Sequence, residues 1–184
     1  MTWALFETTI GSCGLAWNEN GLTVLQLPEE DDDATRARLL TKSGAEGPTM
    51  APKARPAWVN DAITRVREHL AGKPQDLSCI PLDLSRVTPL TAIIYRALQS
   101  VPAGRTATYG ELAGLAGSPG AARAVGRAMA TNPWPVIVPC HRVVAAGGGA
   151  GGFSAHGGLV TKERILQIEG ATLDGSRQRS LFDT

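Results

Sequence analysis

The most constraining local signal in this sequence is the dipeptide Asn20-Gly21, which lies between two apolar runs. Asn-Gly is favoured in two-residue hairpin turns because both central positions require a positive φ. Residues 2–10, 12–18 and 22–27 are therefore predicted to form a small antiparallel sheet of three short strands. Pro28 and the acidic run 29–33 end this sheet and lead into a short helix near 33–42, whose start suits negative charge.

The remainder of the first half is predicted to be a loop followed by a helix. Residues 44–57 are rich in glycine, proline and alanine and are interpreted as the loop. Apolar residues then recur at helical spacing from Val59 to Leu70, and Gly72 is a natural stop. We therefore expect an α/β N-terminal domain over residues 1–84, since 184 residues suffice for two small domains.

The second half is predicted to be mainly α-helical, with a C-terminal domain over residues 85–170 and a tail over 171–184. Thr88-Pro89 is a typical helix start. Residues 108–111 form a capping box that opens a second helix, and Gly117 ends it. Ser118-Pro119 is predicted to cap and start a third helix that runs to about residue 131. These two short helices, joined by a turn with glycine, predict a helix-turn-helix over 108–131.

The expected third helix combines small residues with two arginines. Alanine and glycine occupy most of positions 121–130, while Arg123 and Arg127 are spaced i,i+4 and share one face. Small side chains are compatible with tight packing against another helix. Two like charges at this spacing disfavour an isolated helix, however, and a phosphate backbone opposite them would relieve the repulsion. The composition therefore favours a nucleic-acid-binding face.

Charge and cysteine usage narrow the class of protein. Residues 85–170 carry 8 basic and 3 acidic side chains, against 8 and 12 in residues 1–84. This asymmetry is compatible with a solvated surface and with a nucleic-acid partner. The three cysteines, at positions 13, 79 and 140, show no Cys-x-x-Cys spacing, which argues against a disulfide scaffold and a zinc site. With no signal peptide and no apolar run of about 20 residues, we expect a cytoplasmic protein without membrane contact, associated with the nucleoid if the source is bacterial.

The segment from Asn132 to Val143 carries the strongest chemical signal. It reads Asn-Pro-Trp-Pro-Val-Ile-Val-Pro-Cys-His-Arg-Val, so prolines restrict the backbone before Cys140. A lone cysteine is most often a small core residue. Here His141 and Arg142 follow it, and their basicity is expected to favour the thiolate. Because adjacent side chains of an extended chain point to opposite faces, a Cys140–His141 pair requires a turn or an intervening water.

This segment resembles the active site of the O6-alkylguanine-DNA alkyltransferases, also called methylated-DNA–protein-cysteine methyltransferases. The resemblance covers roughly residues 87–170. Its pieces are Pro139-Cys140-His141-Arg142-Val143 after Asn132-Pro133, Thr108-Tyr109, residues 122–126, and Gly157-Gly158-Leu159 leading to Lys162 and Glu169. The resemblance implies direct-reversal DNA repair, in which the O6-alkyl group of a guanine flipped out of duplex DNA is transferred irreversibly to Cys140.

The resemblance also implies the roles of the catalytic residues. Cys140 is the nucleophile, His141 draws off the thiol proton through a water, and Glu169 orients and charges that imidazole. Asn132 braces the active-site turn, and Tyr109 donates a proton to the departing guanine. The product is a thioether, which is a poor leaving group, so each molecule reacts once. No cofactor and no metal ion is implied.

The implied DNA contacts fall on the predicted helix-turn-helix. Arg123 enters the base stack in place of the flipped guanine, and Tyr109 meets that guanine and its phosphate. The helix docks in the minor groove of double-stranded DNA, where small residues permit close approach. The residues expected to contact DNA are Arg123, Arg127, Tyr109, Ala122 and Gly126. We expect a monomer that binds this DNA alone or cooperatively.

One loop departs from the family pattern Gly-x-Tyr-Ser-Gly-Gly. Residues 151–158 read Gly-Gly-Phe-Ser-Ala-His-Gly-Gly, with Phe153 in place of tyrosine and two additional residues. Phe153 still offers an aromatic wall, and the Ser154 N–H can still reach O6 of guanine. The carbonyls of Cys140 and Val143 are expected to read the guanine amino group. The longer loop bears on the shape of the pocket and hence on the accepted alkyl size, and His156 is interpreted as a solvated loop residue.

Three other functions account for parts of the sequence. A relative that binds alkylguanine without reacting would lack the cysteine, so Cys140 argues against it. A cysteine hydrolase using Cys140, His141 and Glu169 would leave the helix-turn-helix unexplained. A transcriptional regulator would require an effector domain or a further DNA-binding domain, and it does not account for residues 139–143.

Overall fold

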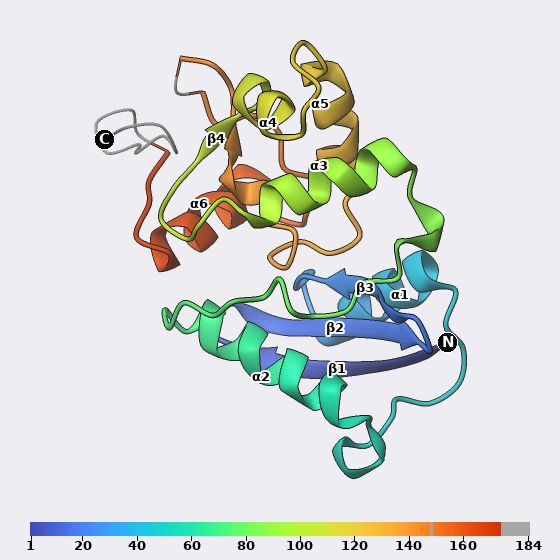
Figure 1. Cartoon of the computed structure of the whole chain (residues 1–184). Coiled ribbons are helices and arrows are strands. Elements are labelled where there is room, and N and C mark those ends of the chain that lie inside the picture. Colours follow the sequence, from blue (N-terminus) through green and yellow to red (C-terminus); the bar gives the residue numbers. More distant parts are fainter. Residues whose placement is uncertain (148, 174–184) are drawn as a thin grey trace. The chain divides into compact units, whose positions relative to one another are not determined.

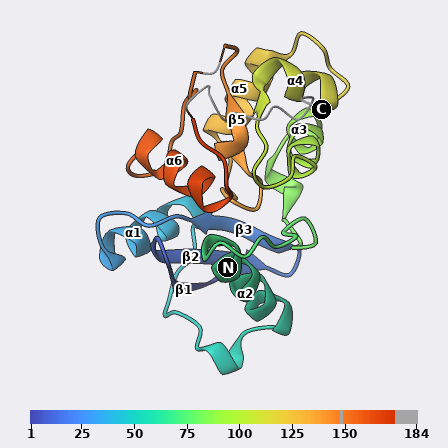
Figure 2. The same cartoon turned by 90° about the vertical axis from the view of Figure 1, so that its left-hand side faces the viewer.

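The computed structural model describes residues 1–147 and 149–173. Its chain divides into two compact units (Figures 1 and 2). Unit 1 comprises Met1–Arg86 together with Pro133–Ile137, and unit 2 comprises Val87–Asn132 together with the chain from Val138 onward. Most of the predicted tail, from residue 174, lies outside the described residues. Within the described part, no helix has the length and apolar character needed to cross a membrane.

Unit 1 contains the predicted three-stranded antiparallel sheet. Its strands are β1 (Thr2–Thr8), β2 (Gly11–Asn18) and β3 (Gly21–Gln26), in the order β1-β2-β3. A hairpin joins β2 to β3 as predicted, but its two loop residues are Glu19 and Asn20, because Gly21 already pairs with Asn18. Gly21 has a φ of +139°, which explains the glycine there. The strand prediction is therefore confirmed.

Two helices cover opposite faces of this sheet (Figures 1 and 2). Helix α1 (Asp32–Ser43), capped by Asp31, packs on the face that carries Trp3 and Ala16. Helix α2 (Ala57–Leu70) packs on β1 from the other face, where Arg67 lies over the Phe6 ring. Strand β2 is buried on both faces as a result. The predicted loop 44–57 contains one short 3-10 turn, η1 (Pro52–Ala54), and a second, η2 (Leu84–Arg86), ends this part of the unit.

Unit 2 is mainly α-helical, as the sequence predicts. Its helices are α3 (Pro89–Gln99), α4 (Tyr109–Leu115), α5 (Ala122–Ala130) and α6 (Leu159–Ile168). Helices α3, α4 and α5 pack together, and the buried Tyr95 hydroxyl of α3 donates to the Ala128 carbonyl of α5 at 2.9 Å. A short parallel pair, β4 (Ala107–Thr108) and β5 (Val143–Val144), links the start of α4 to the chain that follows the cysteine.

The helix-turn-helix is present, with one correction to its predicted boundaries. The capping box forms as predicted, because Thr108 and Glu111 satisfy each other's backbone N–H groups. The third helix does not start at Ser118-Pro119, however; α5 begins at Ala122. Gly120 adopts a φ of +89°, and this left-handed residue interrupts any helix before position 121. Ser118-Pro119 therefore belongs to the turn between the two helices.

Candidate active site

Cys140 lies on a single tight turn, followed directly by His141. The turn is the 3-10 helix η3 (Cys140–Arg142), closed by a 2.9 Å hydrogen bond from the Arg142 N–H to the Pro139 carbonyl. The Cys140 N–H donates to the Val138 carbonyl at 2.8 Å. Asn132 braces the same place, because its Nδ2 donates to the Val138 carbonyl at 2.8 Å. Of the two alternatives that the sequence leaves open, a turn or an intervening water, the structure shows a turn.

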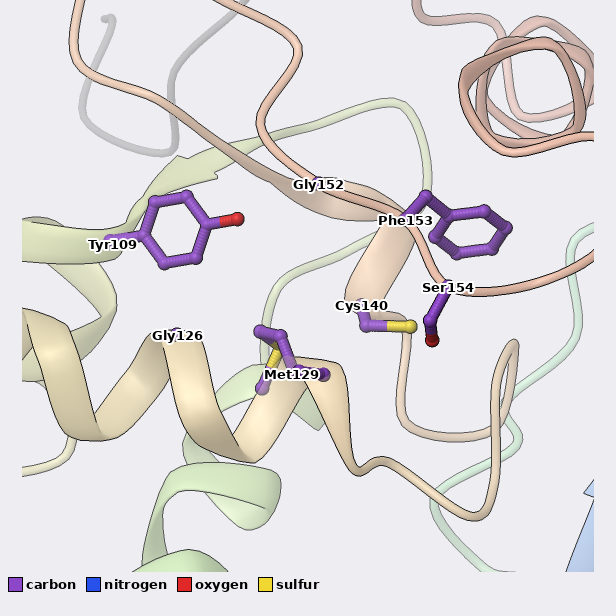
Figure 3. A pocket seen from close by; sticks show the side chains of 8 residues that line it. Tyr109, Gly126, Met129, Cys140, Gly152, Phe153 and Ser154 are labelled. Atoms are coloured by element: carbon purple, nitrogen blue, oxygen red, sulfur yellow. The ribbon is translucent and has the colours of Figure 1, made fainter.

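The Cys140 side chain borders a cavity of about 230 Å³ within unit 2. Figure 3 shows Tyr109 reaching over from α4 with its hydroxyl directed into the cavity, and the Cys140 sulfur pointing to the side where Phe153 and Ser154 lie. The complete lining is Tyr109, Gly126, Met129, Ala130, Cys140, Gly152, Phe153 and Ser154. A cavity of this kind, with a nucleophile and aromatic walls, can hold a planar ligand against the thiol.

Three of these cavity residues are absent from the sequence-based prediction. Met129 and Ala130 follow Gly126 at spacings of three and four on α5, so helical periodicity could have identified them. Gly152 belongs to the predicted pocket loop. Its neighbour Gly151 has a φ of +66°, and a Cβ there would lie 2.9 Å from the Tyr109 hydroxyl. Glycine at 151 therefore lets the loop approach Tyr109.

Val143, which the sequence predicts to bind the substrate, lies away from the cavity. It is buried in β5 and does not line the cavity. Its carbonyl accepts a 2.6 Å hydrogen bond from Nζ of Lys162, which also donates to the Ala150 carbonyl. Burial is the main cause that lowers the pKa of Lys162 to about 8. Lys162 thus joins the chain after the cysteine turn to the start of the pocket loop.

His141 and Glu169 meet as predicted, but Arg142 joins them. His141 Nε2 lies 2.9 Å from Oε1 of Glu169. Arg142 binds the same carboxylate through two atoms, with Nη2 at 2.7 Å from Oε1 and Nε at 2.9 Å from Oε2, and Nη1 donates to the Val101 carbonyl. All three side chains are buried. Glu169 follows α6 directly as its C-cap, as predicted, so the helix end delivers the carboxylate to this site.

The expectation that basic neighbours favour the thiolate is wrong. Burial raises the pKa of the Cys140 thiol above its ordinary value, although a hydrogen bond from Asn132 and the charge of Lys162 act in the opposite direction. Arg142 does not supply the missing charge, because its guanidinium is bound to Glu169. The resting cysteine is therefore a thiol, and a base must remove its proton before it can act as a nucleophile.

The predicted DNA-contacting residues lie on α4 and α5. Arg123 and Arg127 are exposed on α5, whereas the buried face of the helix consists of Val125, Ala128 and Met129. Ala122 and Gly126 are half-buried, and a methyl group at Gly126 would meet no other atom within 4 Å. The helix therefore presents its two charges away from the core of unit 2. His156 is exposed, in agreement with its interpretation as a loop residue.

Comparison with known proteins agrees with this geometry. Residues 89–171 match the family described as 6-O-methylguanine DNA methyltransferase, DNA binding domain. A protein from Methanothermobacter thermautotrophicus, named methylated-DNA–protein-cysteine methyltransferase, is 32% identical over 88% of this chain and 81% of its own length. A protein of the same name from Mycobacterium leprae is 35% identical over 89% of this chain and 88% of its own.

Solved structures lead to the same family. A crystal structure of Mycobacterium tuberculosis OGT in complex with DNA matches with a TM-score of 0.69 and 32% identity, covering 100% of both chains. The O6-methylguanine-DNA methyltransferase from Pyrococcus kodakaraensis matches with a TM-score of 0.71 and 29% identity over 92% of this chain and 99% of its own. Sequence, fold and site agree, and the chain belongs to the methylated-DNA–protein-cysteine methyltransferase family.

Proposed function

We propose that this protein repairs O6-alkylguanine in double-stranded DNA by transferring the alkyl group to its own Cys140. The observation that carries the proposal is the position of Cys140, whose thiol borders a cavity walled by Tyr109 and Phe153 while the next residue pairs with a buried carboxylate. Relatives that are 32% and 35% identical carry the name of this activity.

The proposed reaction is a direct displacement at the alkyl carbon. His141, acting through a water, takes the Cys140 proton, and the sulfur then bonds to the carbon as the carbon–O6 bond breaks. Tyr109 protonates the departing guanine. Because Glu169 engages Nε2 of His141, the proton acceptor toward the thiol is Nδ1. The thioether product has no step that restores the thiol, so the protein is consumed one molecule per lesion, without a cofactor.

Base flipping follows from the burial of the thiol. Only 7% of Cys140 is exposed, so O6 of a stacked guanine cannot reach it. Extruding the nucleotide costs a few kcal/mol, and less where the lesion is weakly paired. We assign this role to the helix-turn-helix in the minor groove, with Arg123 filling the vacated space and Arg127 contacting phosphate. The Ser154 N–H and the carbonyl of Cys140 would bind the guanine edge. A monomer suffices, since one chain supplies every group.

The proposal is tested by the intact mass of the protein after incubation with a duplex that contains one O6-methylguanine, followed by peptide mapping. We expect a gain of one CH2 unit on the Cys140 peptide that saturates at one per protein. Cys140→Ser should bind the duplex without gaining mass, and Cys79→Ser, at an exposed cysteine, should react like the wild type. Binding without transfer by the wild type would instead indicate a recognition-only protein.

A further inference from the structure

The five residues before Val138 pack as part of unit 1, although both of their flanks belong to unit 2. Pro133–Ile137 joins the N-terminal unit, while Asn132 and Val138 belong to the unit of the active site. Three of its five residues are buried, and Trp134 is only 1% exposed. Only Val138 and Pro139 separate it from Cys140. The chain that leads to the cysteine is therefore held by the sheet domain.

Two hydrogen bonds attach this segment to strand β3. The Leu25 N–H donates to the Pro133 carbonyl at 2.8 Å, and the Trp134 indole N–H donates to the Leu22 carbonyl at 2.9 Å. Strand β3 is at the edge of the sheet, where backbone groups otherwise lack a neighbouring strand. Leu22 is itself fixed, because its N–H donates to the Pro81 carbonyl at 2.9 Å and its carbonyl accepts from the Asp83 N–H at 2.9 Å. Both backbone groups of Leu22 are thus held by hydrogen bonds.

The segment also contains a strained residue. Val136 has a φ of +73° and is the one non-glycine residue with positive φ among residues 1–147 and 149–173. A β-branched side chain is strongly disfavoured in this conformation. Such a conformation persists only where the surroundings impose it. Here the Trp134 anchor lies on one side, and the bonds of Asn132 and Cys140 to the Val138 carbonyl lie on the other.

We propose that Trp134 is a positioning residue, whose bond to β3 holds the strained chain so that the Cys140 thiol faces the cavity. The inference rests on the proposed function, since it concerns alkyl transfer to that thiol. Pro139 restricts φ next to the cysteine, so a shift at residues 134–137 passes to the turn rather than being absorbed. Misplacement of a reacting group by about 1 Å can cost up to about a hundredfold in rate.

The test compares Trp134→Phe with Trp3→Phe. Both substitutions keep an aromatic ring and remove one indole N–H bond to a backbone carbonyl in unit 1, since Trp3 donates to the Gly47 carbonyl at 3.0 Å. Three quantities are measured for each variant: the thermal midpoint, the affinity for the lesion duplex, and the single-turnover rate at saturating protein. We expect similar midpoints and affinities, but a rate about tenfold lower in Trp134→Phe alone.

A second readout does not depend on DNA. Iodoacetamide alkylation of Cys140 is followed by peptide mapping, with the exposed Cys79 of the same molecule as reference. Loosening the turn should raise the Cys140/Cys79 ratio severalfold in Trp134→Phe and leave it unchanged in Trp3→Phe. Equal rates and equal ratios in the two variants would overturn the inference. If the wild type transfers no alkyl group, the proposed function fails, and the alkylation ratio alone still decides the role of Trp134.

Discussion

At the scale of single residues, the site is organised around one buried carboxylate. Glu169 accepts from Arg142 through both of its oxygens and from His141 through one. A buried ion pair is tolerated only when its hydrogen bonds are complete, and the fork of an arginine matches both carboxylate oxygens. With the ionised carboxylate as acceptor, Nε2 of His141 carries the ring proton. Arg142 thus neutralises Glu169, and the carboxylate fixes the imidazole tautomer.

Val136 offers a prediction on backbone strain. At most positions a glycine variant is less stable than an alanine variant by about 0.5–1 kcal/mol. At Val136 the order should reverse, with Val136→Gly more stable than Val136→Ala by about 1 kcal/mol, because only glycine adopts a φ of +73° without a steric penalty. The free energy of unfolding in urea measures both variants.

The matched control is the neighbouring valine at 138, which is also buried but has no positive φ. Val138→Gly should be less stable than Val138→Ala by about 1 kcal/mol, in the usual order. The same order at both positions would show that Val136 is not strained.

At the scale of elements, one face of α5 packs against the core and the cavity, and the other face carries two exposed arginines. Val125, Ala128 and Met129 face inward, and Met129 also borders the cavity beside Cys140. Arg123 and Arg127 are exposed. One helix of nine residues therefore forms part of the cavity wall and carries the charges that we assign to DNA. Because a phosphate contact releases counterions, DNA binding through this charged face should weaken as the salt concentration rises.

The two arginines should be separable by experiment. Arg123→Ala should slow transfer from a lesion in duplex DNA by about tenfold or more while leaving the reaction with free O6-benzylguanine nearly unchanged, since the free base needs no flipping. Arg127→Ala should weaken duplex binding for every sequence and reduce the slope of log affinity against log salt by about one. Single-turnover rates and binding titrations at several salt concentrations provide these values.

Arg38→Ala is the control, because Arg38 is exposed on α1 in the other unit. It should change neither the rate nor the salt slope. Equal slowing of the duplex and free-base reactions by Arg123→Ala would remove the flipping role from that residue.

At the scale of the whole molecule, each unit contains a buried thiol, Cys140 in the site and Cys13 in the sheet. Burial is the largest cause that raises the pKa of Cys13 from 9.0 to about 12; the Glu7 charge adds to it, and a hydrogen bond with Thr8 opposes it. The folded state therefore keeps a proton that the unfolded chain releases near pH 9. The stabilisation is complete below that pH and is lost as pH rises toward 12.

Alkaline unfolding of Cys13→Ala should isolate this contribution. Between about pH 8 and about pH 10.5, the stability advantage of the wild type over the variant should fall by about 2 kcal/mol. Lys162, whose folded pKa is lowered to about 8, makes stability rise with pH over the same range. Its contribution cancels in the comparison, because both proteins contain it. Chemical unfolding at a series of pH values measures the difference. Cys79→Ala, at an exposed cysteine, should show no such trend. The prediction is refuted if the stability difference between the wild type and Cys13→Ala does not change with pH.

The sequence by itself determined the elements and the identity of the reactive segment. Asn20-Gly21, the capping box at Thr108 and the apolar spacing before Gly72 act through local backbone geometry, so they predict the hairpin, α4 and α2 without any tertiary information. Pro139-Cys140-His141-Arg142-Val143 is equally local, and it indicates the family without any tertiary information. The start of α5 was missed because Gly120 adopts a positive φ that Ser118-Pro119 alone does not reveal.

Only the tertiary structure decided the electrostatics of the site and the placement of the cysteine turn. Arg142 lies next to Cys140 in the chain, yet it binds Glu169, which is 27 residues away. Burial, which depends on the packing of the whole unit, raises the pKa of Cys140 against its basic neighbours. The bond from Trp134 to Leu22 spans 112 residues. Local propensity and periodicity carry no information on contacts at such separations, because these form only when distant segments pack together.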